Sequence, residues 1–449
     1  MNDDSLNENI LTGEKSLMYY KSLLNFPVSM SCIASSDNDN QNIESKNDES
    51  KNDESKNDES KNDESKNDES KNDKTMDMNF WICKDTGIIQ IKPVPSFDDI
   101  YIDAHNTSYG GVWRNLFNLF VNELEVFISD DLKYEEIDIL EIGGGSLMLA
   151  NKILTSPKIG NQINLYKVYE KNISVQLSND SRIEIVPEYL TNETDLQRSF
   201  SGNNIQLILH SHVIEHVWNP NEFITIIRKI LLLSYQNTNQ NNNSNNNLLK
   251  HCFIAPNLQS TFAKKYTNAL NFEHNFYITE PFIDTILHNN GFEIIRKVMY
   301  LDHSILYFTQ ISQLSTSNPN SNSNIKPFPN LYSVYKSHLD EFFKYHQTLV
   351  HRINKSVQKV QLPIYLYGAH IFSQYLIAFG LKVDKIKCIL DNSPQKQQKR
   401  LYGTSLRVFD PSCIVNDTDG CIVILKAASY QEEIRKQLTE LNHRVIIIE

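Results

Sequence analysis

Short apolar runs alternate with helical patterns along residues 137–311, and this alternation predicts a doubly wound α/β sheet. Strands are expected at 137–142, 163–170, 182–188, 205–210 and 251–256, with helices at 148–154, 221–233 and 280–292. Gly291 suits the C-terminal cap of the last of these helices. Two further strand-like runs, at 293–301 and 304–311, follow one another without a helix, which predicts an antiparallel edge.

The same alternation returns near the C-terminus. A long helical stretch at 330–359 precedes strands at 364–369, 385–390, 421–427 and 444–449, with helices at 371–380 and 432–441. This pattern predicts a second, smaller α/β domain of the Rossmann type. We therefore expect a small N-terminal module at 1–99, a central domain at 100–312, a linker at 313–329 and a C-terminal domain at 330–449.

Three segments have low sequence complexity. They are the Lys-Asn-Asp-Glu-Ser repeats at 44–74, an Asn-rich stretch at 236–247 and a Ser/Asn-rich stretch at 315–324. None contains enough apolar side chains to offset the entropy lost on ordering, so all three are expected to be mobile surface segments.

Composition narrows the class of protein. Of the 449 residues, 40% are hydrophobic and 10% aromatic, which is enough for a sizeable core, and the net charge is -12. No basic stripe with interleaved aromatics is present, so nucleic acid is not an expected partner. No secretory signal or membrane-spanning run is found, and the six cysteines form no CxxC pair. We expect a cytoplasmic protein with reduced thiols and no membrane partner.

A glycine-rich turn follows the strand expected at 137–142. Glu141 ends this strand region, and Gly143, Gly144 and Gly145 lead into the next helix. Glycines at this place let the backbone turn sharply and approach a ligand at the carboxyl end of the strand. The pattern E-x-G-x-G resembles motif I of class I S-adenosylmethionine-dependent methyltransferases. Glu170, at the end of the next predicted strand, is placed to accept hydrogen bonds from the ribose of that cofactor.

The segment 206–216 resembles motif IV of the same superfamily and also contains H-x-x-E-H, as His212, Glu215 and His216. H-x-x-E-H on a helix is the zinc site of inverted zinc peptidases. Here it follows a predicted strand and lacks a third downstream ligand, so peptidase chemistry and a metal ion are not expected. His210 is expected to contact the cofactor, and His212 to face the substrate.

Glu273 and His274 lie in the loop after the strand at 251–256, at the sheet edge where substrates bind in doubly wound folds. An adjacent carboxylate and imidazole can form a base near neutral pH.

In order along the chain, the segments resemble the sugar C-methyltransferase family, which methylates nucleotide-activated keto-deoxysugars. The similar segments are 25–32, 81–91, 103–113, 268–281, 364–380, 389–404 and 423–434. The resemblance implies S-adenosylmethionine as methyl donor, a nucleotide sugar as substrate and a C-terminal α/β domain. It also implies that His274 removes a proton beside a ketone with support from Glu273, while His216 and Tyr109 assist through the enolate oxygen.

Two positions depart from this family. Asn271 stands where the family has a tyrosine two residues before the Glu-His pair. The family's N-terminal zinc site uses CxxC pairs, whereas Thr86 stands where a partner of Cys83 would fall, and Cys32 has no near partner. Two thiolates do not complete a tetrahedral site, so structural zinc is not expected.

The predicted C-terminal domain carries its own strand–turn–helix with an acidic residue at the end of the following strand. Family resemblance suggests that it holds the nucleotide part of the substrate or closes the active site. The residues expected to bind substrate there are Tyr367, Gly368, His370, Asp391, Asn392 and Lys396.

Three alternatives remain open. The first is O- or N-methylation of another small metabolite. The second is an NAD-dependent oxidoreductase built on the C-terminal half, against which the absence of a full G-x-G-x-x-G argues. The third is a non-catalytic binding protein on the same scaffold.

Overall fold

The computed structural model describes residues 6–34, 69–102, 110–129, 136–171, 180–188, 190, 205–239, 249–312, 325–427 and 430–449. Contacts divide the chain into two units. One comprises Met1–Ser22, Met78–Val94 and Ala104–His346, and the other comprises Leu23–Asp77, Pro95–Asp103 and Gln347–Glu449. N-terminal residues thus contribute to both units, and the module boundaries expected at 99, 312 and 329 stay a prediction.

A seven-stranded sheet forms the centre of the first unit. Its strands are β5 (Ile137–Ile142), β6 (Ile163–Tyr169), β7 (Ile183–Val186), β8 (Ile205–Ser211), β9 (Lys250–Pro256), β10 (Phe292–Tyr300) and β11 (Ser304–Ile311). They lie in the order β10-β11-β9-β8-β5-β6-β7. Strand β11 is antiparallel to both of its neighbours, whereas the other pairs are parallel. This is the strand order of class I methyltransferases, and it confirms the predicted fold class and the antiparallel edge.

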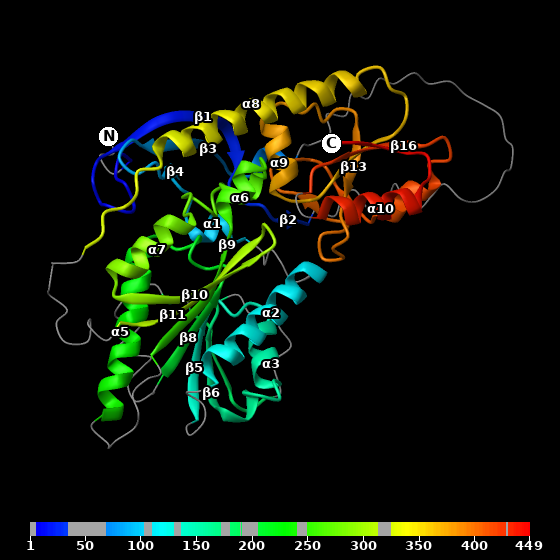
Figure 1. Ribbon diagram of the computed structural model, residues 1–449. Coiled ribbons are helices and arrows are strands. Elements are labelled where there is room, and N and C mark those ends of the chain that lie inside the picture. The colour runs from blue at the N-terminus through cyan, green and yellow to red at the C-terminus, as the bar shows by residue number, and fades with distance from the viewer. Residues whose placement is uncertain are drawn as a thin grey trace, which may run out of the picture. The chain divides into compact units, whose positions relative to one another are not determined.

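Helices cover both faces of this sheet (Figure 1). Helices α2 (Gly111–Ile128) and α3 (Met148–Leu154) lie on one face, and α5 (Pro220–Asn239) and α7 (Glu280–Asn289) lie on the other. Leu116, Phe120 and Leu124 of α2 are fully buried and pack into one hydrophobic cluster with residues of β5, β8 and β11. Burial of this apolar stripe is the main force that holds the helix to the sheet.

Short connections link the remaining elements of this unit. Helix α6 (Leu258–Ala263) and the 3₁₀ helices η4 (Gly160–Gln162) and η5 (Thr267–Ala269) follow the strands. Gly291, predicted to cap α7, has a positive φ of 73°. Because this left-handed conformation is easy only for glycine, the helix ends where the sequence predicts.

A three-stranded sheet in the order β1-β3-β4 is built from the N-terminal segment. It consists of β1 (Leu17–Pro27), β3 (Thr75–Cys83) and β4 (Ile89–Ile91), and the division between the two units passes through β1 and β3. It also passes through the long helix α8 (Tyr332–Val357), which matches the helix predicted at 330–359.

The second unit contains a five-stranded sheet in the order β15-β13-β12-β16-β17, and all its pairs are parallel. Its strands are β12 (Ile364–Tyr367), β13 (Ile386–Leu390), β15 (Val408–Phe409), β16 (Cys421–Leu425) and β17 (Val445–Ile448). The helices α9 (Ile371–Ala378), η8 (Pro411–Asn416) and α10 (Gln431–Leu441) connect them. This sheet confirms the predicted second α/β domain.

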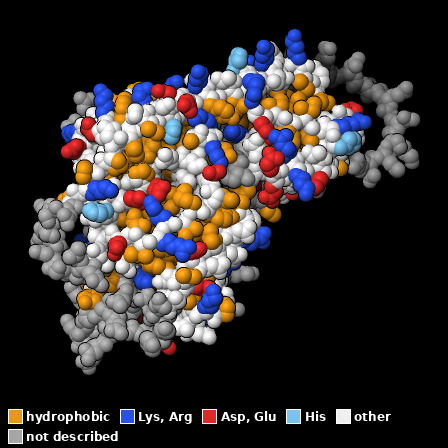
Figure 2. All heavy atoms as spheres, in the orientation of Figure 1, with side chains coloured by type: hydrophobic (Ala, Val, Ile, Leu, Met, Phe, Trp, Pro, Cys, Tyr) orange, Lys and Arg blue, Asp and Glu red, His pale blue; other side chains and the backbone are white. Residues whose placement is uncertain are grey.

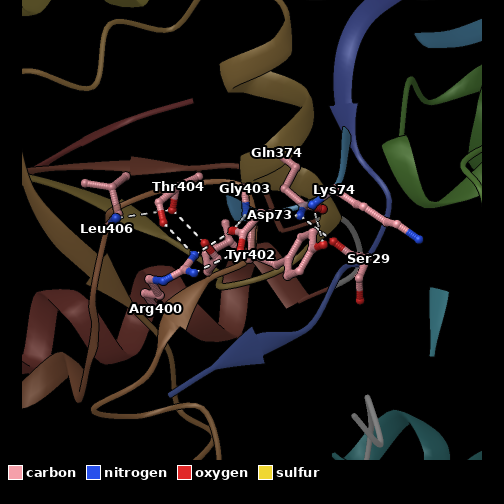
Figure 3. Close-up of polar contacts among 10 residues, drawn as sticks. Ser29, Asp73, Lys74, Gln374, Arg400, Tyr402, Gly403, Thr404 and Leu406 are labelled. Atoms are coloured by element: carbon pink, nitrogen blue, oxygen red, sulfur yellow. Dashed lines mark hydrogen bonds and ion pairs between the residues drawn. The ribbon is translucent and has the colours of Figure 1, made fainter. Parts of the chain in front are cut away.

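N-terminal residues are built into this second unit. Strand β2 (Cys32–Ile33) pairs antiparallel with β14 (Arg400–Leu401), and the short elements η2 (Glu69–Asn72) and α1 (Phe97–Ile100) lie in the same unit. Arg400 donates to both carboxylate oxygens of Asp73, at 2.6 and 2.9 Å, and both side chains are less than a tenth exposed (Figure 3). Gly403 N also donates to Asp73, and Lys74 N donates to the Tyr402 hydroxyl.

The repeat segment expected to be mobile at 44–74 lies outside the described residues as far as Asp68. At its end the prediction is wrong, because Asp73 is a buried ion-pair partner and not part of a solvated loop. The sequence repeat conceals this, since Asp73 differs from the Asp of the other Lys-Asn-Asp units only in being followed by Lys74 where they are followed by Glu.

Surface and thiol features agree with the composition. In the described residues, no helix is long and apolar enough to cross a membrane. All six cysteines are free thiols. On the face shown in Figure 2, basic and acidic side chains of the described residues are interspersed, without a continuous basic stripe.

Candidate active site

The glycine-rich turn after β5 leaves no room for side chains. A Cβ added at Gly143, whose φ is +75°, would lie 2.6 Å from Cγ2 of Val213. A Cβ added at Gly144 would lie 2.3 Å from Cγ1 of Val168 in β6. The turn is therefore pressed against the neighbouring strand and against the turn that follows β8. This close approach explains why glycines stand at the carboxyl edge of the sheet.

Two glutamates fix this turn. The Glu170 carboxylate, just beyond β6, accepts a hydrogen bond of 3.0 Å from Gly145 N. Glu141 is only 2% exposed, and its Oε2 accepts from the Tyr166 hydroxyl at 2.8 Å. Burial raises the pKa of Glu141 to about 7, although the bond from Tyr166 lowers it. Glu170 lies where a cofactor ribose is expected, whereas Glu141 supports the turn from below.

His210 does not lie where a cofactor could reach it. It is fully buried in β8, and its ring stacks on Phe253 at 4.6 Å and contacts Phe223 edge-on. Burial also holds the pKa of His210 well below its usual range, so the ring is neutral. The expectation that His210 binds the cofactor is corrected here: it is a core residue, because its position along β8 points it into the sheet's packing.

A tight turn follows β8 and carries the rest of the H-x-x-E-H segment. His212 has a positive φ of 54°, and its amide donates to the Ile254 carbonyl. Its two ring nitrogens lie 3.1 Å from the hydroxyls of Ser211 and Ser304. The ring also contacts Trp113 edge-on at 4.6 Å. These contacts hold the turn in place, and the predicted contact of His212 with substrate stays a prediction.

His216 and His274 meet although they are distant in sequence. Their Nε2 atoms are 3.3 Å apart. The other ring nitrogen of His274, Nδ1, lies 2.6 Å from the Asn268 carbonyl. Because a carbonyl oxygen only accepts, Nδ1 carries the proton, and the neutral ring has its lone pair on Nε2. Burial lowers the pKa of His274, while Glu273 and the Asn268 carbonyl raise it.

Asn271, the departure from the family pattern, organises this loop. Its side-chain oxygen accepts from the backbone amides of Glu273 and His274, at 2.8 and 3.1 Å. The backbone amide of Asn271 donates to the His274 carbonyl. An asparagine can close such a turn on itself, whereas a tyrosine cannot. The substitution thus fixes the Glu-His pair by a different local device.

Glu215 was not singled out by the sequence as a site residue. Its side chain is 1% exposed, and neither carboxylate oxygen has a hydrogen-bond partner on another residue in the described part of the chain. Burial raises its pKa to about 8. Its ligand atoms, those of His216 and those of His274 all lie within 4.8 Å of one another. The motif H-x-x-E-H was a signal for this group, but His212 is not a member of it.

The residues predicted to bind substrate in the second unit form one connected turn. Asp391 follows β13, and its Oδ2 accepts from Ala369 N at 2.9 Å, beside Gly368 with its φ of +97°. Lys396 Nζ lies 3.5 Å from the same carboxylate oxygen and donates to the Ala369 carbonyl. Asp391 thus supports the turn after β12 as Glu170 supports the turn after β5.

The neighbouring predicted residues are also engaged within this unit. Asn392 exchanges two hydrogen bonds with Gln437, at 2.9 and 2.8 Å. Tyr367 is buried, and burial raises the pKa of its hydroxyl. His370 is the N-cap residue of α9. Tyr109, expected to assist catalysis, lies outside the described residues.

Comparisons with known proteins agree with this organisation. The family model described as C-methyltransferase C-terminal domain matches residues 329–446. No curated protein matches the chain.

Several solved methyltransferases are similar to the chain, at low identity. The DszA carbon methyltransferase is 13% identical with a TM-score of 0.34, over 45% of this chain and 55% of that chain. The CurJ carbon methyltransferase is 12% identical with a TM-score of 0.28, over 40% and 50%. Magnesium protoporphyrin IX methyltransferase from Synechocystis PCC 6803 with bound SAM is 12% identical with a TM-score of 0.28, over 46% and 86%. This chain thus spans about half the length of the two carbon methyltransferases, and such TM-scores locate no site or substrate in it.

Two findings bear on which class of protein this is. They are the family match at 329–446 and the strand order of the first unit. The predicted resemblance is confirmed for residues 329–446. Residues 329–446 match the family described as C-methyltransferase C-terminal domain.

Proposed function

We propose that the protein methylates a carbon atom next to a ketone in a nucleotide-linked keto-deoxysugar, by way of an enolate. The observation that carries this proposal is the pair His216–His274 at the carboxyl edge of the sheet, with an unprotonated Nε2 on a neutral His274. A neutral imidazole in a buried loop is suited to remove a proton from carbon.

The donor is proposed to bind at the turn after β5. Gly143 and Gly144 lie in close contact with Val213 and Val168, and with Gly145 they form a turn without side chains that lets a ligand approach the backbone. Glu170 is the residue proposed to hold the ribose hydroxyls. The bound donor supplies an electrophilic methyl group on a sulfonium.

His274 is proposed as the base. Its Nε2 takes the proton from the carbon beside the ketone, and the electron pair of that C–H bond forms the enolate. Glu273 stabilises the imidazolium that results, because its charge raises the pKa of His274. His216, and Tyr109 beyond the described residues, are proposed to steady the enolate oxygen. The enolate carbon would then form the new bond to the methyl group while the bond between that methyl and sulfur breaks, which leaves S-adenosylhomocysteine.

Contacts between turns connect the proposed donor site after β5 with the proposed catalytic histidines. Val213, which touches the Gly143 turn, is in the same tight turn as His216, whose amide donates to the Val213 carbonyl. A base placed there is adjacent to the donor turn in the chain's own packing. The second unit is proposed to hold the nucleotide, at Tyr367, Gly368, His370, Asp391, Asn392 and Lys396.

Hydrogen exchange tests the proposal before any methyl transfer. The protein is mixed in D₂O with a set of keto-deoxysugar nucleotides and S-adenosylhomocysteine, and exchange of the proton beside the ketone is followed by NMR. We expect catalysed exchange at one carbon, which is lost in His274→Asn. Methyl transfer without exchange in any substrate would instead favour O- or N-methylation, which needs no carbon base.

A further inference from the structure

The buried side chain of Glu215 lies beside the histidine pair, and the question is which group stabilises its carboxylate there. Its carboxyl group is buried, and no described residue other than Glu215 itself, through its own backbone amide, donates a hydrogen bond to it. A buried carboxylate is costly unless it is protonated, paired with a charge or bound to a cation. The amide of His216 does not solve this, because it donates to the Val213 carbonyl.

The spacing of the two histidines fits a metal ion as well as a direct contact. Two nitrogens bound at 2.0–2.1 Å to one tetrahedral zinc ion are about 3.3 Å apart. The Nε2 atoms of His216 and His274 are 3.3 Å apart. A hydrogen bond between the two rings would have the same length. The distance alone therefore does not distinguish a hydrogen bond from a shared metal ion, and the position of Glu215 has to be considered. A cation can engage both the nitrogens and the Glu215 carboxylate at once, because these ligand atoms all lie within 4.8 Å of one another.

The surroundings of His274 are those of a metal-binding histidine. Its Nδ1 donates to the Asn268 carbonyl at 2.6 Å, which fixes the ring and directs the Nε2 lone pair toward His216. Hydrogen bonds from the second ring nitrogen to a carbonyl are the usual way in which proteins orient such ligands. Asn271 fixes the backbone of the same residue.

We propose that Glu215, His216 and His274 bind one divalent transition-metal ion of the zinc class, and that this ion switches the base off. Two nitrogen ligands and one oxygen ligand favour such an ion over Mg²⁺ or Ca²⁺. Three protein ligands leave one position for water or a substrate oxygen. The switch rests on the proposed function, because a bound ion occupies the Nε2 lone pair that His274 uses to remove a proton.

The ligand set is not that of a zinc peptidase. In that class the first histidine of H-x-x-E-H is a ligand and the glutamate is a base. Here the ring nitrogens of His212 lie beside Ser211 and Ser304, and His274 from another loop takes its place.

Cobalt binding tests the site without methyl donor or acceptor. The full chain is stripped with a chelator and titrated with Co²⁺, which gives strong visible absorption in a tetrahedral site, and the affinity for Zn²⁺ is measured by competition with a coloured chelator. We expect one equivalent of tetrahedral Co²⁺ in the native protein. In Glu215→Gln the affinity should fall by about tenfold or more. His288→Asn, on the exposed end of α7, is the matched control and should bind as the native protein does.

Melting temperatures separate lost binding from lost folding. Glu215→Gln replaces the buried carboxyl group by an amide of nearly the same volume, so it should melt no lower than the native protein without metal, and Zn²⁺ should raise only the native melting temperature. Weak octahedral cobalt spectra, or equal affinity in Glu215→Gln, would overturn the site. Cobalt bound with full hydrogen exchange at the substrate carbon would overturn the switch. Neither result bears on whether the metal-free protein transfers methyl groups.

Discussion

The Nε2 atoms of His216 and His274 lie 3.3 Å apart, although 58 positions separate these residues in the chain. One follows β8 and the other follows β9 and η5, so the parallel order of the two strands brings both loops to one edge of the sheet. The contact joins the H-x-x-E-H segment to the Glu-His pair, which are separate in the sequence. Most of the chemistry proposed for this protein depends on it.

Replacement of the base should remove turnover without removing the donor. We predict that His274→Asn lowers methyl transfer by about 100- to 10,000-fold, because a positioned general base contributes an effect of this size. Affinity for S-adenosylmethionine, measured by calorimetry, should change little, since its proposed site is the turn after β5.

The control for this prediction is His288→Asn, whose side chain is exposed at the end of α7. It should turn over as the native protein does. If His274→Asn retained a tenth or more of native turnover, His274 would not be the base.

The glycine turn provides a prediction with a built-in rescue. Gly144→Ala should strongly weaken binding of S-adenosylmethionine, because the new Cβ would lie 2.3 Å from Cγ1 of Val168. Val168→Ala removes that atom, so the double variant should recover much of the affinity. Gly111→Ala, where a Cβ meets nothing within 4 Å, should leave the affinity unchanged. Calorimetry on the four variants checks this, and a double variant no better than Gly144→Ala would contradict the packing account.

Glu141 should make folding stability depend on pH. Its pKa is raised from 4.5 to about 7 in the folded protein. Between these values the unfolded chain loses its proton and the folded chain keeps it, so the free energy of unfolding falls as pH rises through this window. The full effect, present above about pH 7, is on the order of 3 kcal/mol.

Glu141→Gln should therefore lose less stability between pH 5 and pH 8 than the native protein, as measured by urea unfolding. Tyr166→Phe should lose more, because the hydroxyl of Tyr166 is the bond that lowers the pKa of Glu141. Contributions from other buried groups, such as Glu215, are the same in all three proteins and cancel. An equal loss in Glu141→Gln and the native protein would rule out this assignment.

The ion pair of Asp73 and Arg400 should stabilise the second unit. Asp73→Ala leaves the Arg400 guanidinium buried without its carboxylate, which should cost about 3–5 kcal/mol in unfolding free energy. Asp73→Ala combined with Arg400→Met should recover much of this, because no unpaired charge remains. Asp384→Ala, at an exposed position, should change stability by less than about 0.5 kcal/mol. Denaturation curves measure these unfolding free energies. An Asp73→Ala variant as stable as the native protein would show that the pair is not buried in solution.

The sequence predicts those features that depend on local pattern. Strand β5 and its glycine turn follow from an apolar run and three glycines, and β10 and β11 follow from two strand patterns without a helix between them. His210 was misassigned because a histidine at the end of a strand looks the same whether it points to a ligand or into the core. Its ring is in fact stacked on Phe253.

Other features depend on contacts between distant segments and have no local signature. Asp73 differs from the other Asp residues of the repeat only in being followed by Lys74, and its ion-pair partner Arg400 is far away in the sequence. In the sequence Asn271 is a departure from the family pattern, and only the structure shows that its side chain closes the turn that holds His274. Glu215 belonged to a motif that was set aside as a whole, and its own burial could not be read from the sequence.

Reaction with S-adenosylmethionine labelled with ¹³C in its methyl group tests the central claim most directly. The native protein is incubated with this donor and a nucleotide-linked keto-deoxysugar, and the product is examined by NMR for the atom that carries the label. The account predicts a labelled methyl bonded to the carbon beside the ketone, formed by the native protein and lost in His274→Asn. A labelled methyl on oxygen or nitrogen, at a rate unaffected by His274→Asn, would contradict it.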